Sequence, residues 1–163
     1  MPTSNENLTE VQTSYRQLAV AATNLNAISD ALGTVVAELD AALKKLSLGI
    51  PCWVYVCGSP SDGPFYNYYQ FGYDKVGGKW AIALRRVWGN DHEPEREDSE
   101  EWAFNDAPRW LRIDAIDKIP DLITELTKKA NETTTQLGNK LPKAKELATA
   151  ITAVAKQCSP LSK

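Results

Sequence analysis

The sequence predicts an α+β fold: a long N-terminal helix, a three- to four-stranded antiparallel β-meander, and a long C-terminal helix antiparallel to the first. Both ends of the chain carry apolar residues at alternating steps of three and four, a pattern typical of helices that pack in heptads. The middle of the chain is instead rich in aromatic and β-branched residues, with a Gly-Gly pair between two such runs. We treat residues 1–163 as one domain.

The N-terminal helix is expected over residues 5–47. Its heptad positions run from Val11 to Leu46, and no proline interrupts them. The pattern is weakest near Ser29, where a polar residue takes a heptad position and Gly33 follows closely. Since the heptad phase continues beyond this point, we favour one unbroken helix.

The central residues 50–112 are expected to form a small β head. Gly77-Gly78 predicts a tight hairpin between strands 65–76 and 79–88. Counting outward from this turn pairs Phe71 with Leu84 on a face expected to be core. On the other face it pairs Gln70 with Arg85, and Gly72 with Ala83. The residues at the centre of that second face have small side chains. Such a surface could be exposed to solvent or could contact a group that packs close to the backbone.

Two further strands are candidates. Residues 50–57 form a β-branched and aromatic run, which predicts a strand before the hairpin. Residues 102–112 are a candidate fourth strand, which Pro108 would place at an edge of the sheet.

The C-terminal helix is expected over residues 114–159. Its heptad phase passes straight through Gly138 and Pro142. A proline within a helix clashes with the carbonyl four residues before it, and glycine at that place best accommodates the resulting kink. We therefore favour one kinked helix over two helices joined by a short turn.

The heptad positions of the two helices match in length. Pairing Leu46 with Ile119 brings Leu18 to Leu147 and Val11 to Val154, which predicts a helical stalk with the β head at one end and both termini at the other. Apolar residues beside these positions widen each apolar stripe beyond what one partner helix covers. We expect the excess to be buried either in a folded-back bundle or in a homodimer.

Charge and cysteine content limit the environment and the partners. A net charge of -3 and a pI near 5.2 give no basic surface for a phosphate backbone, so nucleic acid is not expected as a partner. The acidic character concentrates in the loop 90–101, which has seven acidic residues and one arginine. The chain shows no signal peptide and no apolar stretch of about 18 residues, and its cysteines are sparse. We expect a cytoplasmic protein with no membrane association.

Candidate catalytic and metal-binding residues are few. His92 is the only histidine, whereas a metal site needs several ligands at fixed spacing, so we expect no metal and no cofactor. Cys52 and Cys57 lie in an apolar run, where a thiol pKa tends to rise. No nucleophile–base pair stands out, and an enzyme is therefore the less favoured interpretation.

The aromatic residues supply the candidate binding site. All of them except Tyr15 lie within residues 53–110. Most are expected to fill the core, while some of those on the outer face of the sheet are able to stack on a partner and bond to it. The candidate binding residues are Tyr66, Tyr68, Gln70, Arg85, Arg109, Trp110 and Arg112.

We expect a non-catalytic protein-interaction or regulatory module that self-associates through its helices. A protein partner would bind the head and the acidic loop. The alternative is a small-molecule-binding domain that holds its ligand on the outer face of the sheet, against Gly72, Ala81 and Ala83. No motif in the sequence identifies a family.

Overall fold

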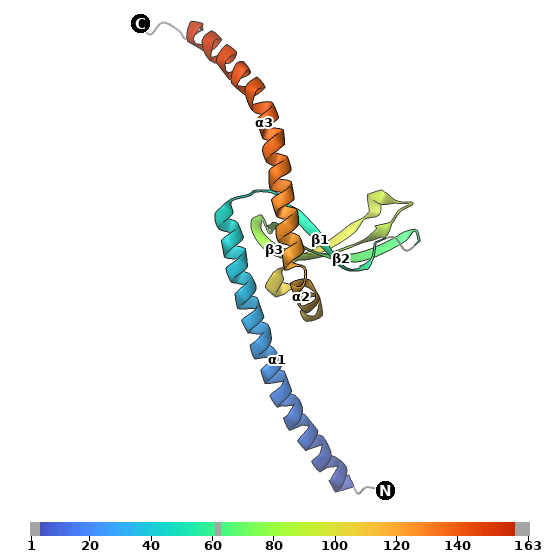
Figure 1. Ribbon diagram of the computed structural model, residues 1–163. Coiled ribbons are helices and arrows are strands. Elements are labelled where there is room, and N and C mark those ends of the chain that lie inside the picture. The colour runs from blue at the N-terminus through green and yellow to red at the C-terminus, as the bar shows by residue number, and fades with distance from the viewer. Residues whose placement is uncertain (1–3, 61–62, 159–163) are drawn as a thin grey trace.

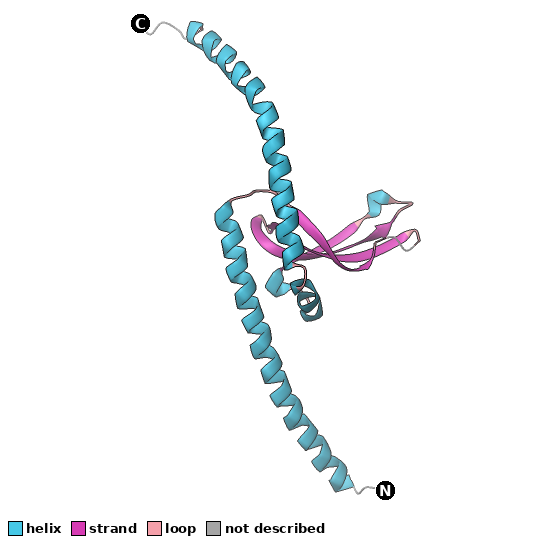
Figure 2. Ribbon diagram, viewed as in Figure 1, coloured by secondary structure: helices cyan, strands magenta, loops and turns pink. Residues whose placement is uncertain are grey.

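The structure is a computed structural model that describes residues 4–60 and 63–158, with side chains from residue 7 onward (Figures 1 and 2). Its helices are α1 (Ser4–Leu46), α2 (Arg109–Ile116) and α3 (Ile119–Gln157). Its strands are β1 (Cys52–Ser59), β2 (Phe65–Val76), β3 (Lys79–Asn90) and β4 (Asp98–Ala103). Short 3-10 turns occupy Pro94–Arg96 and Phe104–Asp106. The predicted α+β class, with a long helix at each end of the chain and an antiparallel sheet between them, is confirmed.

Helix α1 is continuous through its weakest stretch. Gly33 is buried there, and a Cβ on it would lie only 2.7 Å from Asn105 Oδ1. The glycine therefore lets the turn Phe104–Asp106 approach the helix closely, and it does not break the helix.

Helix α3 is also continuous through Gly138 and Pro142, as predicted, and Figure 1 shows it bending along its outer part. Its start differs from the prediction. Residues 109–116 form the separate helix α2, and Pro120 occupies the first turn of α3, where its missing N–H costs no hydrogen bond.

The sheet is an antiparallel meander with the order β1-β2-β3-β4. The predicted hairpin register is confirmed, because Phe71 pairs with Leu84, Gln70 with Arg85, and Gly72 with Ala83. Gly77 and Gly78 both have positive φ, 57° and 80°, as a tight two-residue hairpin turn requires. The alternation of side chains along the strands therefore sets the two faces of the sheet as expected.

The predicted fourth strand over residues 102–112 is wrong. Strand β4 ends at Ala103, and Pro108 directly precedes α2, because the fixed φ of proline suits a helix start. Part of the expected acidic loop is strand instead. Glu100 and Glu101 pair with Arg86 and Arg85 of β3, and these opposite charges support the pairing.

The core lies between one face of the sheet and all three helices. Its fully buried side chains include Phe71, Leu84, Leu111 and Leu122. Only part of each long helix takes part in it. The buried residues of α3 are Leu122 and Leu126, and those of α1 are Gly33, Val36 and Leu43.

A hydrogen bond also fixes α1 to the sheet. Pairing between β3 and β4 starts at Ala83, so the N–H of Ile82 lies just beyond the end of the β4 ladder. Asp40 of α1 fills this place, because its Oδ1 accepts from Ile82 N at 2.8 Å. Asp40 also forms an ion pair with Lys44 one turn further along the helix.

The two long helices do not form the expected stalk within one chain. They overlap only beside the sheet and extend beyond it in opposite directions, so the outer ends of α1 and α3 lie far apart (Figure 1). Leu18 and Leu147, which the expected register pairs, are 63% and 54% exposed.

The reason lies in the segment that precedes α3. Arg109 of α2 bonds to Asn26 midway along α1, whereas Lys129 of α3 bonds to Pro51, beyond the end of α1. Residues 109–129 therefore run along the core face in the same direction as α1, so the two long helices are not antiparallel as expected (Figure 1). Helix α3 must cross this face to bury Leu122 and Leu126, and it then leaves on the side where α1 ends.

Candidate interaction surfaces

Trp53 lies on the outer face of the sheet, which is the face away from the helices, and contacts several residues there. It pairs with Gly72, and a Cβ on that glycine would lie 2.4 Å from the indole ring, so the ring lies directly on the backbone. The indole Nε1 donates to Asp74 Oδ2 at 2.9 Å. The guanidinium carbon of Arg85 lies 4.2 Å from the ring centroid, a cation–π contact.

Arg85 connects this ring to both neighbouring strands. Its Nε donates to Gln70 Oε1 at 2.7 Å, and its Nη1 lies 4.0 Å from Glu101 Oε1. Gly72, one of the three residues against which the small-molecule alternative places its ligand, is thus covered by the protein's own indole. The sequence did contain a signal for this neighbour, the small Gly72–Ala83 pair, although it did not identify Trp53.

Tyr66 and Tyr68 extend the outer face toward the end of the sheet away from the Gly77-Gly78 turn, with ring centroids 6.1 Å apart. The Tyr66 hydroxyl donates to Glu97 Oε2 at 2.8 Å and lies over Gly89. This bond to a carboxylate, reinforced by burial and nearby negative charge, raises the pKa of Tyr66 to about 12. The acidic segment after β3 is thereby attached to the sheet.

Replacing Glu97 with glutamine is expected to lower the pKa of Tyr66 from about 12 toward its ordinary value of 10.0. Because the folded-state pKa is the higher one, the bond stabilises the fold below the ordinary pKa, and this contribution is lost as pH rises toward 12. An ultraviolet absorbance titration of tyrosinate, with Tyr66→Phe to assign the signal, measures the shift. Glu95→Gln serves as the control, and an unchanged Tyr66 titration in Glu97→Gln would contradict the prediction.

The remaining candidate residues, Arg109, Trp110 and Arg112, lie elsewhere, on α2. Trp110 packs edge-on against Tyr69 with ring centroids 4.9 Å apart. Tyr69 points to the helix-covered face of the sheet, because it alternates with Tyr68 along β2. The structure therefore does not bring the two groups of predicted residues together.

Arg109 and Arg112 line a polar hollow between α1 and α2. The hollow has a volume of about 470 Å³ and also includes Ser29, Asp30 and Gly33. Arg109 Nη2 donates to Asn26 Oδ1 at 2.9 Å, while the buried Arg112 Nε has no hydrogen-bond partner among the residues described. An apolar recess of about 70 Å³ adjoins it, lined in part by Leu25, Leu32 and Ile113.

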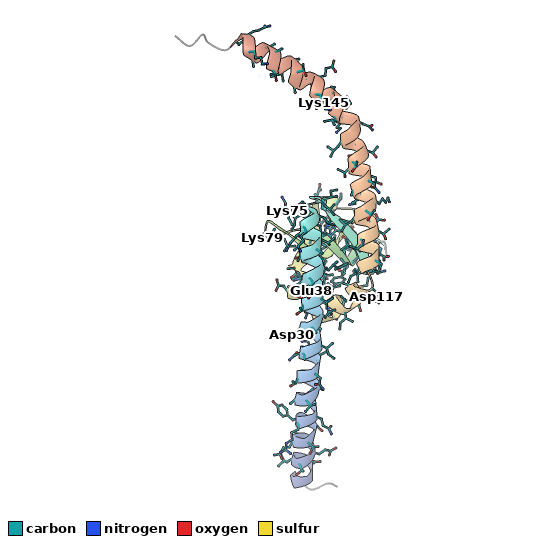
Figure 3. All side chains as sticks on the ribbon, turned by 60° about the vertical axis from the view of Figure 1, so that its left-hand side comes forward. Asp30, Glu38, Lys75, Lys79, Asp117 and Lys145 are labelled. Atoms are coloured by element: carbon teal, nitrogen blue, oxygen red, sulfur yellow. The ribbon has the colours of Figure 1, made fainter. Side chains whose placement is uncertain are left out.

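Most of the exposed large apolar side chains lie on the two long helices, many of them where these helices extend beyond the head. Figure 3 shows side chains there with no other element of the chain beside them. The α1 stripe consists of Leu8, Val11, Tyr15, Leu18 and Leu25, which are 48–71% exposed. The α3 stripe consists of Leu137, Leu147, Ile151 and Val154, which are 54–68% exposed. Contiguous exposed apolar side chains of this kind are a candidate surface for contact with another molecule.

Two of the cysteines, Cys52 and Cys57, lie on β1. Burial raises the pKa of the Cys52 and Cys57 thiols, which keeps both largely protonated near neutral pH. Within the described residues, no three histidine, cysteine or acidic side chains are grouped so as to hold a metal ion. The described helices include none that combines the length and the apolarity needed to cross a bilayer.

Comparison with known proteins adds no further constraint. No protein-family model, no curated protein and no solved structure matches this chain.

Proposed function

We propose that this chain is a non-catalytic protein-interaction module that self-associates through its two long helices and binds a protein partner through its head. The observation that carries the proposal is the exposure of two long apolar stripes in heptad phase. Each stripe continues a helix face that is buried where it meets the sheet, and an apolar stripe in heptad phase is typical of a helix that packs against another helix.

The head supports the second part of the proposal. Its outer face presents Tyr66 and Tyr68, and the neighbouring edge strand β4 exposes Asp98, Glu100 and Glu101. Aromatic side chains at a surface, rimmed by charged groups, are typical of protein recognition sites. The small-molecule alternative has less support, because Trp53 already covers Gly72 on this face.

The test of self-association is the molar mass of the full chain, measured by sedimentation equilibrium over a range of concentrations. We expect more than one chain per particle. Leu18→Glu, which places a charge in the α1 stripe, should weaken the association, whereas Gln17→Glu, which adds the same charge outside the stripe, should not. A single-chain mass at every concentration would contradict the proposal.

A further inference from the structure

We infer that a second copy of this chain covers each stripe in a reciprocal exchange: the α1 arm of one copy pairs antiparallel with the α3 arm of the other. The α1 arm is residues 8–29, and the α3 arm is residues 133–154. The inference rests on the proposed self-association and specifies its geometry.

The directions of the helices make this pairing possible. Helix α1 runs toward the head and α3 runs away from it, so the two arms project from opposite sides of the head (Figure 1). A second copy turned end over end places its α3 arm beside the first copy's α1 arm, with opposite chain direction. A single two-fold axis then satisfies both arms of both copies with the same contact, so the assembly closes at two chains.

The heptad positions of the two arms correspond along their whole length. In antiparallel helices each a position faces a d position, because one chain runs backward relative to the other. One register satisfies this rule throughout the arms. Its layers are Leu8 with Val154, Val11 with Ile151, Tyr15 with Leu147, Leu18 with Ala144, Ala22 with Lys140, Leu25 with Leu137, and Ser29 with Thr133.

The few polar residues at heptad positions also find suitable neighbours in this register. Ser29 faces Thr133, so the polar heptad position of the α1 arm meets a hydroxyl side chain. The long Lys140 side chain faces the small Ala22, which leaves room for its stem to lie on the partner helix while its amine reaches water.

Charge favours pairing of unlike arms. The α1 arm, residues 8–29, contains one acidic and one basic side chain, whereas the α3 arm, residues 133–154, contains one acidic and three basic side chains. Pairing α3 with a second α3 therefore brings two positively charged helices together, which the exchanged arrangement avoids.

The head also offers an apolar contact at the place where the α1 arm meets it. The apolar recess lined by Leu25, Leu32 and Ile113 lies at the junction of the α1 arm with α2. In the proposed register Leu137 of the second copy lies opposite Leu25 and is therefore next to this recess. The contact between copies would thus continue directly from the buried core.

Disulfide trapping between singly substituted chains tests the arrangement. The starting chain carries Cys57→Ser and Cys158→Ser, which leaves Cys52, a buried thiol. Four variants are prepared in it: Val11→Cys, Leu25→Cys, Leu137→Cys and Ile151→Cys. Pairs of variants are mixed, allowed to exchange subunits and oxidised mildly. Circular dichroism confirms that each variant keeps its helices, and all four positions are exposed in the single chain.

The same four variants provide matched and mismatched pairs. Val11 with Ile151 and Leu25 with Leu137 should form covalent dimers, because each pair shares a layer. Val11 with Leu137 and Leu25 with Ile151 should not, because they are offset by about 21 Å along the helix, far beyond the reach of a disulfide.

Each other outcome overturns the exchange. Val11–Val11 or Ile151–Ile151 links would show that like arms pair, and a two-chain mass without links in the matched mixtures would show that the arms lie apart. Both results would still agree with the proposed self-association. A single-chain mass would instead contradict the proposed function itself, so the two failures are distinguishable.

Discussion

Replacing Phe71 with alanine is expected to lower the free energy of unfolding by about 3–5 kcal/mol. Phe71 is fully buried in the middle of β2, and its ring meets Phe104 edge-on with centroids 6.3 Å apart. Truncation removes this apolar surface from the core and leaves a cavity between the sheet and the helices, which are held too closely on several sides to collapse fully.

Denaturant unfolding at one fixed protein concentration measures this effect, because self-association changes apparent stability with concentration. Phe65→Ala is the matched control. Phe65 lies on the same strand but is 67% exposed, so its truncation should change stability little. Equal losses in the two variants would argue against the placement of Phe71 in the core.

Replacing Asp40 with alanine is expected to cost about 1–3 kcal/mol, the range for leaving a buried hydrogen-bond donor unsatisfied. The donor is the N–H of Ile82, which lies beyond the end of the β4 ladder and bonds to Asp40 Oδ1. Alanine favours helix more than aspartate does, so the observed loss is reduced by a few tenths of a kcal/mol.

Two controls separate the hydrogen bond from helix propensity. Asp40→Asn keeps an oxygen acceptor for Ile82 and should retain much of the stability. Asp30→Ala makes the same substitution at an exposed site on the same helix and should cost little. A loss in Asp40→Ala no larger than that in Asp30→Ala would contradict the assigned role.

The sheet was the most predictable part of the molecule, because its signals are local. A Gly-Gly pair fixes the hairpin turn, and the alternation of side chains then determines which residues share a face. The placement of Phe71 in the core and of Gln70 beside Arg85 follows from counting alone. Helix continuity at Gly33 and Pro142 was predictable for a similar reason, since heptad phase persists through both places.

The arrangement of the helices was not predictable from periodicity. A heptad stripe shows that a helix face needs a partner but not which chain supplies it. The matched lengths of the two stripes suggested pairing within one chain. Helix α2, whose short aromatic sequence resembled a strand, instead carries the chain to the other end of the core face before α3 begins.

The candidate site was predicted only in part for the same reason. Tyr66, Tyr68, Gln70 and Arg85 share a face because strand alternation fixes it. Trp110 was grouped with them from nearness in sequence, but the change from strand to helix after Ala103 places it beside Tyr69 on the opposite side of the sheet.

The overlap of α1 and α3 beside the sheet also determines how the molecule responds to force. The chain enters the head from one side and leaves it on the other (Figure 1). Tension applied between the outer ends of α1 and α3 therefore loads the helix–sheet contacts in shear, which slides each helix along the sheet instead of peeling it away one turn at a time. The contacts along each helix then resist the pull together.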